Sequence, residues 1–475
     1  MDCGDHIRSF QFDDSEIKVK MDLKDKKVLV IGFEKTGKAV CNFLLSQNSG
    51  IKIKVSETKK STELRREIQP YQRKGIEFET GGHKIQSFLE SDLIIPSPGV
   101  PPIPPIQQAK KRGIKIISEV ELASRFLKGK VIGITGSNGK STVASLVHNI
   151  LKHRVKSHLA GNIGTPLISF AEKSTADDVF VTELSSFQLE YIEKFAPEVS
   201  ALLNISPDHL DWHGNFSSYL TAKIKLLKNQ KKDQIAVLNR DDPEIWSAKK
   251  QGPKNIFAFS MKNRIHNGCF LQNEWIILNT EAEQKVINIK DIALKGIHNQ
   301  ENIMASILLG HVFQVPLDQI RETIISFKGL EHRLEKVLSL KGVDFYNDSK
   351  ATNIDAALKS IMSFHKKIIL ILGGRDKGGD FSRMKNEIKK RVKEIIVIGE
   401  AKEKIIKALG KAAEIKEAFS LKEAVEWGFE DSNPGEVILL APACTSFDMF
   451  DNFEHRGRVF KQEARKLFKK NRIHQ

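Results

Sequence analysis

The chain has 475 residues, of which 40% are hydrophobic and 28% are charged, and its formal net charge at pH 7 is +16. This length exceeds what one hydrophobic core supports, and the near-average composition argues against a fibrous or largely disordered protein. The basic residues are spread along the whole chain and only 7% of residues are aromatic, so we expect no nucleic-acid partner and assign the positive charge to a polyphosphate substrate.

The cysteines and the N-terminus indicate the compartment. Cys3, Cys41, Cys269 and Cys444 lie far apart and form no CxxC pair, which predicts neither a zinc site nor a disulfide framework. Residues 1–20 lack the continuous apolar core of a signal peptide, and no segment is apolar enough to span a membrane. We therefore expect a cytoplasmic protein with a short N-terminal extension and no membrane insertion.

The first predicted strand, residues 28–31, lies in the segment KKVLVIGFEKTGKAV. Gly32 allows a turn, and Thr36 and Gly37 open a helix whose N-terminal amides could face a phosphate. The GxGxxG pattern of dinucleotide sites is not satisfied, which leaves a nucleotide-sugar site as the expectation.

A proline-rich segment, SPGVPPIPPIQQ, follows in the same region. Proline lacks a backbone N–H donor and fixes φ, so we predict a loop throughout this segment. Its prolines are Pro98, Pro101, Pro102, Pro104 and Pro105.

Two further segments repeat the order of apolar strand, glycine turn and helix. They are KVIGITGSNGKSTVASLVHNIL from Lys130 and KKIILILGGRDKGGDFSRM from Lys366. This order is typical of α/β sheets, and we predict three α/β domains. Residues 1–118 form the extension and a Rossmann-like domain, residues 119–329 a central phosphate-loop ATPase-like domain, and residues 330–475 a Rossmann-like C-terminal domain.

The motif TGSNGKST, residues 135–142, lies between a predicted strand at 131–134 and a helix beginning near Thr142. In such a loop backbone amides surround phosphate oxygens, Lys140 neutralises the β- and γ-phosphates, and the Ser141 hydroxyl can ligate Mg2+. The strict Walker spacing fails by one residue, because Ile134 stands where the first glycine is expected. The alternative is a glycine-rich turn with a solvated lysine, but the flanking strand and helix favour phosphate binding.

Acidic and histidine residues follow the next two predicted strands. Glu183 comes after the strand at 179–181, where a carboxylate would face the same crevice as the loop, or would merely be a helix N-terminal charge. NISPDHLDWH then supplies Asp208, His209, Asp211 and His213 after the strand at 199–203. His209 could bind a metal or substrate, or be a hydrogen-bonded loop residue.

The order of several motifs resembles that of the Mur ligases, over nearly the whole chain from Lys26. These motifs are TGSNGKST, GNIG from Gly161, ELSSFQLE from Glu183, NISPDHLD from Asn204, HNQEN from His298, EHRLE from Glu331 and NDSKATN from Asn347. LGGRDK from Leu372 and APACTSFD from Ala441, followed by NFEHRG, are similar to the members that add D-glutamate.

The resemblance implies an ATP- and Mg2+-dependent amide ligase, expected as a monomer, that joins D-glutamate to UDP-N-acetylmuramoyl-L-alanine through an acyl phosphate. It assigns ATP binding to Gly136, Ser137, Asn138, Gly139, Lys140, Ser141, Thr142, Asn299, Asn302, Arg333 and Asp348. It assigns catalysis to Lys140, Glu183, His209 and Lys223, and metal binding to Ser141, Glu183, His209 and Lys223. It assigns substrate binding to Lys35, Thr36, Asn162, His209, Lys350, Thr352, Lys377, Ser446, Phe447 and Phe453.

Two alternatives to this interpretation differ in sequence. The first is another amide ligase that adds L-alanine, a diamino acid or a dipeptide to the same series of precursors. A ligase that adds a diamino acid would show a DNPR-like motif, whereas the NP pair at Asn433 is followed by Gly435. A non-catalytic nucleotide-binding regulator would lose Lys140, Glu183 or Lys223, and all three are present.

Helical spacing places Lys223 on the apolar face of its predicted helix, whereas Lys225 and Lys228 are better placed for solvent. We predict that Lys223 works as a carbamate, since a CO2 adduct gives it the oxygen donors that Mg2+ accepts. The alternative is a lysine that reaches along the helix surface to water.

Overall fold

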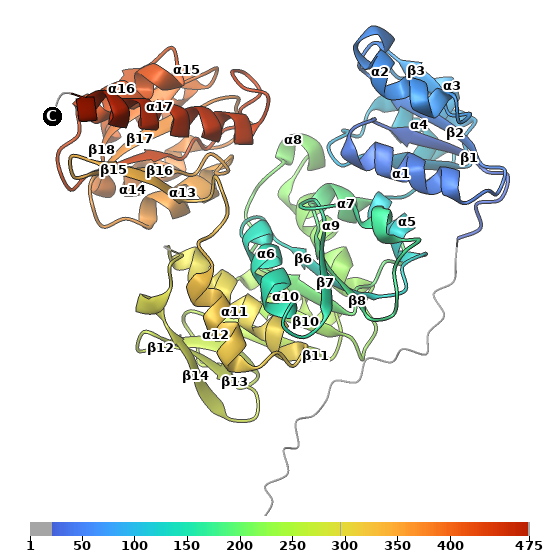
Figure 1. Ribbon diagram of the computed structural model, residues 1–475, viewed down its shortest axis with the longest axis horizontal. Coiled ribbons are helices and arrows are strands. Elements are labelled where there is room, and N and C mark those ends of the chain that lie inside the picture. The colour runs from blue at the N-terminus through green and yellow to red at the C-terminus, as the bar shows by residue number, and fades with distance from the viewer. Residues whose placement is uncertain (1–20, 295, 474–475) are drawn as a thin grey trace, which may run out of the picture. The chain divides into compact units, whose positions relative to one another are not determined.

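The computed structural model describes residues 21–294 and 296–473, which form three α/β sheets (Figure 1). Contacts divide the chain into two compact units. The first unit consists of the described chain up to Ile205 together with Ser217–Ile287 and Ile303–Thr323. It contains the first and second sheets. The second unit combines Ser206–Phe216, Asn288–Asn302 and the chain from Ile324, and it holds the third sheet. The predicted extension and Cys3 lie outside the described residues, and no described helix is long and apolar enough to cross a membrane.

The first sheet is parallel, with the strand order β3-β2-β1-β4-β5 of a Rossmann-type half. Its strands are β1 (Lys27–Ile31), β2 (Lys52–Glu57), β3 (Glu77–Thr80), β4 (Leu93–Pro96) and β5 (Lys115–Ile116). The helices of this part of the chain are α1 (Lys35–Ser46), α2 (Ser61–Gln72), α3 (Ile85–Leu89), α4 (Pro104–Lys111) and α5 (Glu119–Ser124). The predicted Rossmann-like fold of the N-terminal region is confirmed.

Strand β1 is buried on both faces. Val28 and Val30 pack into one hydrophobic cluster, whereas Leu29 and Ile31 pack into another on the opposite face. Successive side chains of a strand point to opposite faces, so a strand covered by helices on both sides needs a continuous apolar run. This explains why VLVI shows no alternation with polar residues.

The prediction of a loop throughout SPGVPPIPPIQQ is wrong for its second half. Helix α4 begins at Pro104, and Pro104 and Pro105 occupy its first turn. The first N–H groups of a helix have no intrahelical partner, so a proline there removes no hydrogen bond, and its fixed φ suits the helix.

The second sheet has the order β14-β13-β12-β11-β10-β9-β6-β8-β7, and the strands from β7 to β12 run parallel. Its strands are β6 (Lys130–Thr135), β7 (Lys156–Gly161), β8 (Asp178–Glu183), β9 (Val199–Leu202), β10 (Ile235–Asn239), β11 (Asn255–Ser260), β12 (Gly268–Gln272), β13 (Trp275–Asn279) and β14 (Glu283–Asn288). The helices here are α6 (Lys140–Leu151), α7 (Ser186–Glu190), α8 (Leu210–His213), α9 (Phe216–Lys228), α10 (Pro243–Ala248), α11 (Ile297–Val312) and α12 (Leu317–Ser326). Short 3-10 turns are η1 (Leu167–Phe170), η2 (Lys249–Gln251) and η3 (Ile289–Asp291). Strand β6 lies between β8 and β9, so their carboxyl ends meet at one edge of the sheet.

The third sheet has the order β15-β16-β20-β17-β18-β19, with β15 antiparallel to β16 and the other pairs parallel. Its strands are β15 (Glu335–Leu340), β16 (Val343–Asn347), β17 (Ile368–Gly373), β18 (Val392–Ile398), β19 (Glu414–Glu417) and β20 (Val437–Leu440). Its helices are α13 (Ile354–Met362), α14 (Lys385–Arg391), α15 (Lys402–Leu409), α16 (Leu421–Glu430) and α17 (Phe453–Ile473), with 3-10 turns η4 (Phe381–Met384) and η5 (Gly410–Ala412).

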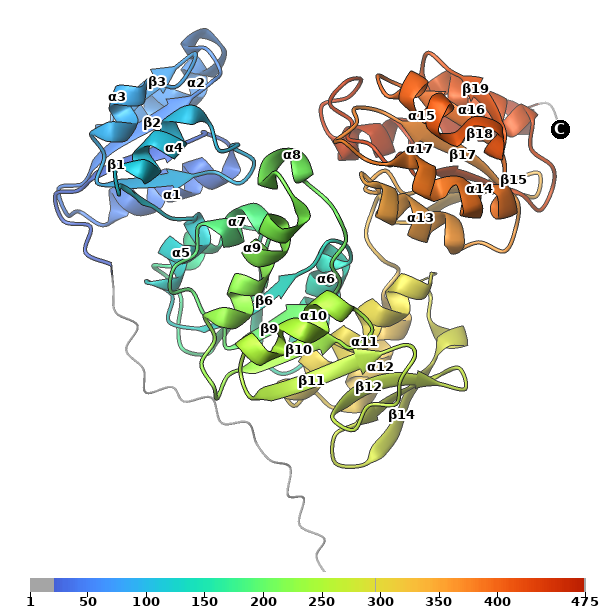
Figure 2. The same ribbon diagram turned by 180° about the vertical axis from the view of Figure 1, so that it is seen from behind.

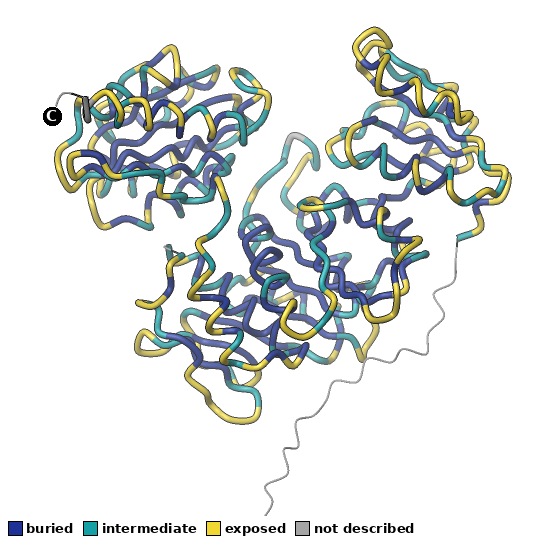
Figure 3. Tube along the Cα trace, in the orientation of Figure 1, coloured by how far each residue is buried: buried dark blue, intermediate teal, exposed yellow. Residues whose placement is uncertain are grey.

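Helices cover both faces of this sheet (Figure 2). Leu370 and Leu372 of β17 belong to the cluster beneath α13–α15, and Ile369 and Ile371 to the cluster beneath α16 and α17. The central strands are accordingly buried along their length, and exposure concentrates in the connecting segments (Figure 3). The predicted three-part α/β fold is confirmed.

Candidate active site

The predicted phosphate loop joins β6 to α6. Gly136 has φ of 155° and Gly139 has φ of 87°, conformations that side chains rarely adopt. A Cβ on Gly136 would also lie 3.1 Å from Leu203 Cβ and 3.2 Å from the carbonyl oxygen of Asn204. Gly139 precedes the first helical residue, so α6 begins at Lys140, slightly earlier than predicted. The loop therefore leads directly into a helix N-terminus that can face an anion.

Lys140 lies over its own loop. Its Nζ donates hydrogen bonds to the carbonyl oxygens of Gly136 and Ser137, each at 2.9 Å. The ammonium is thus held at the mouth of the loop, where it can neutralise phosphate charge.

Glu183 is the last residue of β8, directly beside β6 in the sheet. The register pairs it with Ile134 on one side and with Gly161 on the other. Its buried carboxylate accepts a hydrogen bond from Asn162 Nδ2 at 2.9 Å, and its carbonyl accepts from the Asn162 backbone N–H at 3.0 Å. The structure therefore brings together Glu183, Asn162 and the phosphate loop within the first unit.

Lys223 of α9 contacts the same loop from inside the protein. It is 1% exposed, and its Nζ donates to the Gly136 carbonyl at 2.9 Å and to Thr135 Oγ1 at 3.3 Å. The ammonium also lies 4.9 Å from the ring centroid of Tyr219, whose hydroxyl is 2.9 Å from Ser137 Oγ. The prediction that Lys223 faces the apolar side of its helix is confirmed, and the alternative of a lysine that reaches out to water is wrong.

These residues suit a magnesium nucleotide by the chemistry of their donors. The Ser141 hydroxyl and the Glu183 carboxylate supply the oxygen ligands that Mg2+ prefers, and both groups are buried at the same sheet edge as the loop. Lys223 can supply oxygen ligands only as an adduct, because an ammonium has donors alone.

The N-terminal sheet carries another strand-turn-helix connection, after β1. Lys35 and Thr36 open α1, and Lys35 Nζ donates to the carbonyl of Gly164. Glu57, at the end of β2, accepts from the Phe33 N–H at 2.7 Å and the Lys59 N–H at 3.1 Å. Sequence reasoning missed Glu57, although an acid at the end of the second strand is a known signal for recognition of a ribose.

The environment keeps Glu57 ionised. Burial raises its pKa, but hydrogen bonds from the amides of Lys59 and Phe33 and from Thr58 outweigh burial and leave the pKa below its usual value. Glu57 is therefore an anionic hydrogen-bond acceptor beside the turn.

The second unit holds the remaining predicted nucleotide residues. Asn299 and Asn302 are buried on α11, and Asn302 Nδ2 donates to Asn299 Oδ1 at 3.0 Å. Burial raises the pKa of Asp348, although the Ser360 hydroxyl and the Arg333 guanidinium lower it. Contacts of Asn299, Asn302, Arg333 and Asp348 with ATP stay predictions.

The NISPDHLD segment passes from the first unit into the second at Ser206, and Asp208 in its second part contacts a residue predicted to bind the amino acid. Asp208 Oδ1 lies 3.1 Å from Lys377 Nζ, and Asp208 Oδ2 accepts from Asn353 Nδ2 at 2.9 Å. Asp208 was among the acidic candidates after the strand at 199–203, but no role in the site was assigned to it. His209 has φ of 53°, and its Nε2 lies 3.6 Å from Asp208 Oδ2. Its role as a metal ligand stays a prediction.

The other predicted amino-acid residues follow β16 and β20 in the chain, and Phe453 is the first residue of α17. Lys350 Nζ lies 3.8 Å from the ring centroid of Phe453, and the Thr352 N–H donates to the Lys350 carbonyl at 2.8 Å. Ser446 is buried, whereas the neighbouring Phe447 is 63% exposed. Lys350, Thr352 and Phe453 are thus close neighbours, and Phe447 offers an apolar surface to solvent.

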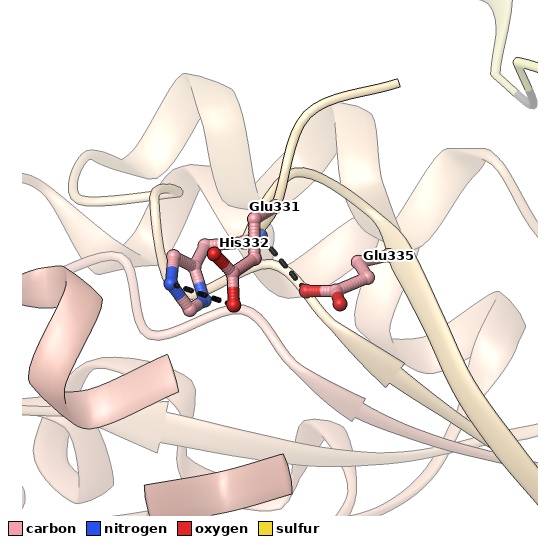
Figure 4. A group of neighbouring side chains, drawn as sticks. All are labelled: Glu331, His332 and Glu335. Carbon is pink, nitrogen blue, oxygen red and sulfur yellow. Dashed lines mark hydrogen bonds and ion pairs between the residues drawn. The ribbon is translucent and has the colours of Figure 1, made fainter. Parts of the chain in front are cut away.

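Among the described residues, Glu331, His332 and Glu335 form a group of metal-ligating type whose ligand atoms lie within 4.8 Å of one another (Figure 4). Lys461 already ion-pairs with both carboxylates, at 3.0 Å for Glu335. Asn347 Nδ2 lies 2.9 Å from His332 Nδ1 and donates to Glu335 at 3.1 Å. Because the ammonium neutralises the carboxylates, we assign this group to anchoring β15 against α17.

Three family profiles match the chain. The Mur ligase MurD-like N-terminal domain matches residues 26–118, the Mur ligase middle domain matches residues 134–310, and the Mur ligase glutamate ligase domain matches residues 332–444. The chain is 45% identical over 450 residues to a UDP-N-acetylmuramoylalanine–D-glutamate ligase of Koribacter versatilis, covering 94% of this chain and 99% of that protein. A ligase of the same name from Acidobacterium capsulatum is 43% identical, with 93% and 96% covered.

Solved structures share the fold at lower identity. A pseudomurein peptide ligase type C from Methanothermus fervidus has a TM-score of 0.59 at 20% identity, with 93% of this chain and 100% of that chain covered. A UDP-N-acetylmuramate–alanine ligase from Thermotoga maritima has a TM-score of 0.58 at 19% identity, with 93% and 99% covered. The profiles and the relatives show that the chain belongs to the Mur ligase family.

Proposed function

We propose that the protein is an ATP-dependent ligase that adds D-glutamate to UDP-N-acetylmuramoyl-L-alanine in peptidoglycan synthesis, giving ADP and phosphate. One observation carries the proposal: a phosphate loop with Lys140 held across its mouth lies beside Glu183 at the end of the neighbouring strand. It occurs in a chain 45% identical to a ligase named for this reaction.

The reaction needs activation, because a carboxylate is a poor electrophile. ATP transfers its γ-phosphoryl group to the alanine carboxylate of the precursor, which forms an acyl phosphate. The amine of D-glutamate attacks the acyl carbon, the C–O bond to phosphate breaks, and an amide forms. The protein contributes charge neutralisation and alignment for both steps.

The first unit supplies the groups for phosphoryl transfer. The N-terminal amides of α6 and the Lys140 ammonium stabilise the negative charge on the triphosphate. Ser141, Glu183 and a carbamylated Lys223 would hold Mg2+, which would supply positive charge to neutralise the phosphates. His209, which belongs to the second unit, is proposed as a further ligand. Asn162, whose Nδ2 donates a hydrogen bond to Glu183, would contact the precursor.

The second unit supplies the proposed amino-acid site. Lys377, with Thr352 and Ser446, would receive the two carboxylates of D-glutamate, since ammonium and hydroxyl groups donate to carboxylates. Lys377 is paired with Asp208 here, so an incoming carboxylate would compete with Asp208 for the same ammonium.

The first domain would bind the uridine nucleotide. Lys35 and Thr36 lie at the N-terminus of α1, where amides favour a phosphate, and Glu57 at the end of β2 would accept a hydrogen bond from a sugar hydroxyl. The protein is also proposed to be cytoplasmic and monomeric. Its three domains are proposed to meet at residues 118 and 329.

Phosphate release tests the function. The protein is mixed with UDP-N-acetylmuramoyl-L-alanine, ATP and Mg2+ and given D-glutamate, L-glutamate, L-alanine or diaminopimelate in turn. We expect phosphate release only when the added amino acid is D-glutamate. Mass spectrometry identifies the amide product formed from the precursor and D-glutamate. Faster release with another amino acid would contradict the proposed specificity.

A further inference from the structure

Asn204, the residue two positions beyond β9, holds the phosphate loop through three hydrogen bonds. Its carbonyl accepts from the Ser137 N–H at 2.8 Å. Its side chain forms a reciprocal pair with Asn138, in which Oδ1 accepts from the Asn138 N–H at 2.8 Å and Nδ2 donates to the Asn138 carbonyl at 3.0 Å. One side chain thus satisfies both backbone groups of a loop residue, as a neighbouring strand would.

Asn204 is itself fixed on both sides. The preceding Leu203 N–H donates to the Thr135 carbonyl at 3.0 Å, and the Leu203 carbonyl accepts from Asn239 Nδ2 at 2.9 Å. The following Ile205 N–H donates to Asp242 Oδ2 at 2.7 Å. Asn204 therefore transmits the position of β9 and β10 to the loop.

The three hydrogen bonds separate the backbone amides of the loop into those that bind Asn204 and those that are left to bind phosphate. The amides of Ser137 and Asn138 donate to Asn204, so they do not point toward a phosphate. The carbonyls of Gly136 and Ser137 accept from Lys140. The phosphate-facing amides must then come from Gly139 onward, at the N-terminus of α6, where the helix dipole also favours an anion.

We propose that Asn204 is a positioning residue for nucleotide binding: it fixes the first half of the phosphate loop so that the amides from Gly139 to Thr142 receive the phosphates. This inference rests on the proposed use of ATP at this loop. The resemblance assigned Ser137 and Asn138 to ATP binding. Here their backbone amides hold the loop in position and do not contact the nucleotide.

Hydrogen exchange of the wild-type protein tests the division directly. Without nucleotide, the Ser137 and Asn138 amides should already exchange slowly, because they are hydrogen-bonded to Asn204. Adding ADP should newly protect the amides from Gly139 to Thr142 and change the exchange of Ser137 and Asn138 little. Rapid exchange of Ser137 and Asn138 that slows only when ADP is added would overturn the proposal.

The variant Asn204→Ala tests the consequence for binding. It removes two hydrogen bonds to the loop, so the affinity for ADP should fall about tenfold, and the Ser137 and Asn138 amides should exchange faster. The affinity for D-glutamate and its KM should stay within about twofold, since a positioning effect on the loop leaves the amino-acid site unchanged.

Asn229→Ala is the matched control, because Asn229 Nδ2 also donates to backbone carbonyls of the first unit, those of Glu193 and Phe195 at 3.1 Å each, but away from the phosphate loop. It should leave ADP affinity unchanged. An equal loss in both variants, or no loss in Asn204→Ala, would contradict the role of Asn204. Binding of ADP needs no second substrate, so this outcome is separate from the turnover assay that tests the proposed function.

Discussion

The ammonium groups of Lys140 and Lys223 both donate to one carbonyl oxygen, that of Gly136, at 2.9 Å each. Lys140 reaches it from the start of α6, and Lys223 reaches it from the buried face of α9. Two positive charges at one acceptor repel each other. This repulsion favours the binding of a polyphosphate, whose negative charge offsets both ammonium groups, or a change of charge on one of the two lysines.

We predict that Lys223 is the lysine whose charge changes, from a cationic ammonium to an anionic carbamate. Replacing it by Ala should lower kcat about a hundredfold or more through loss of a metal ligand, and short carboxylic acids such as acetate should restore part of the activity. Native mass spectrometry should find a CO2 adduct on the wild-type protein that Lys223→Ala lacks. Lys225→Ala, on the same helix, should retain its activity without acetate. Full activity of Lys223→Ala in the absence of any acid would rule out the role.

Lys140→Ala should abolish measurable turnover, a loss of about a thousandfold, because the lysine neutralises charge that develops during transfer of the γ-phosphoryl group. The fold should persist, since the Lys140 ammonium donates to carbonyls of its own loop and does not join distant elements through these bonds. Phosphate release and circular dichroism measure the two effects. Lys152→Ala, at the other end of α6, serves as the control, and activity near the wild-type level in Lys140→Ala would contradict the phosphate-loop assignment.

Lys377→Ala should raise the KM for D-glutamate by about 10- to 100-fold while the KM for ATP changes little, because one charge-assisted contact with the amino acid is lost. Steady-state kinetics with each substrate varied in turn makes the comparison. Lys366→Ala removes another lysine paired with a carboxylate in the same domain, Asp344 at 3.1 Å, and should change neither constant. Equal increases in both KM values for Lys377→Ala would show that the assignment is wrong.

Glu119 should make stability depend on pH. Burial raises its pKa to about 7, although the amides of Ile168 and Leu167 lower it, and Oε2 has no hydrogen-bond partner among the described residues. In the unfolded chain the pKa is about 4.3. The folded protein therefore keeps a proton that the unfolded chain has released, and the free energy of unfolding falls as pH rises from about 4.3 to 7.

The variant Glu119→Gln cannot titrate at this position. The difference in thermal midpoint, variant minus wild type, should therefore increase as pH rises from about 4.3 to 7 and stay constant at higher pH. The change corresponds to about 1.4 kcal/mol for each unit of pKa shift. Glu172→Gln, an exposed control, should follow the wild type. Parallel curves for Glu119→Gln and the wild type from pH 4.5 to 8 would contradict the raised pKa.

Local patterns predicted the elements that carry the chemistry. The strand before TGSNGKST, the helix after it and a strand at 179–181 just before Glu183 were all expected from apolar runs, glycines and their order. The helix at Pro104 was missed, because prolines that break a helix interior are compatible with its first turn, and the pattern alone does not show which position they occupy.

The sequence by itself determined the phosphate loop, the strand and helix on either side of it and the apolar face of α9, because each depends on residues close together in the chain. Only the tertiary structure decided which distant residues meet: Asn204 with Asn138, Lys223 with Gly136, and Asp208 with Lys377. Parallel strands that are remote in sequence end at one edge of a sheet, so strand order selects these pairs. Strand order comes from packing of the whole domain, which no local pattern specifies.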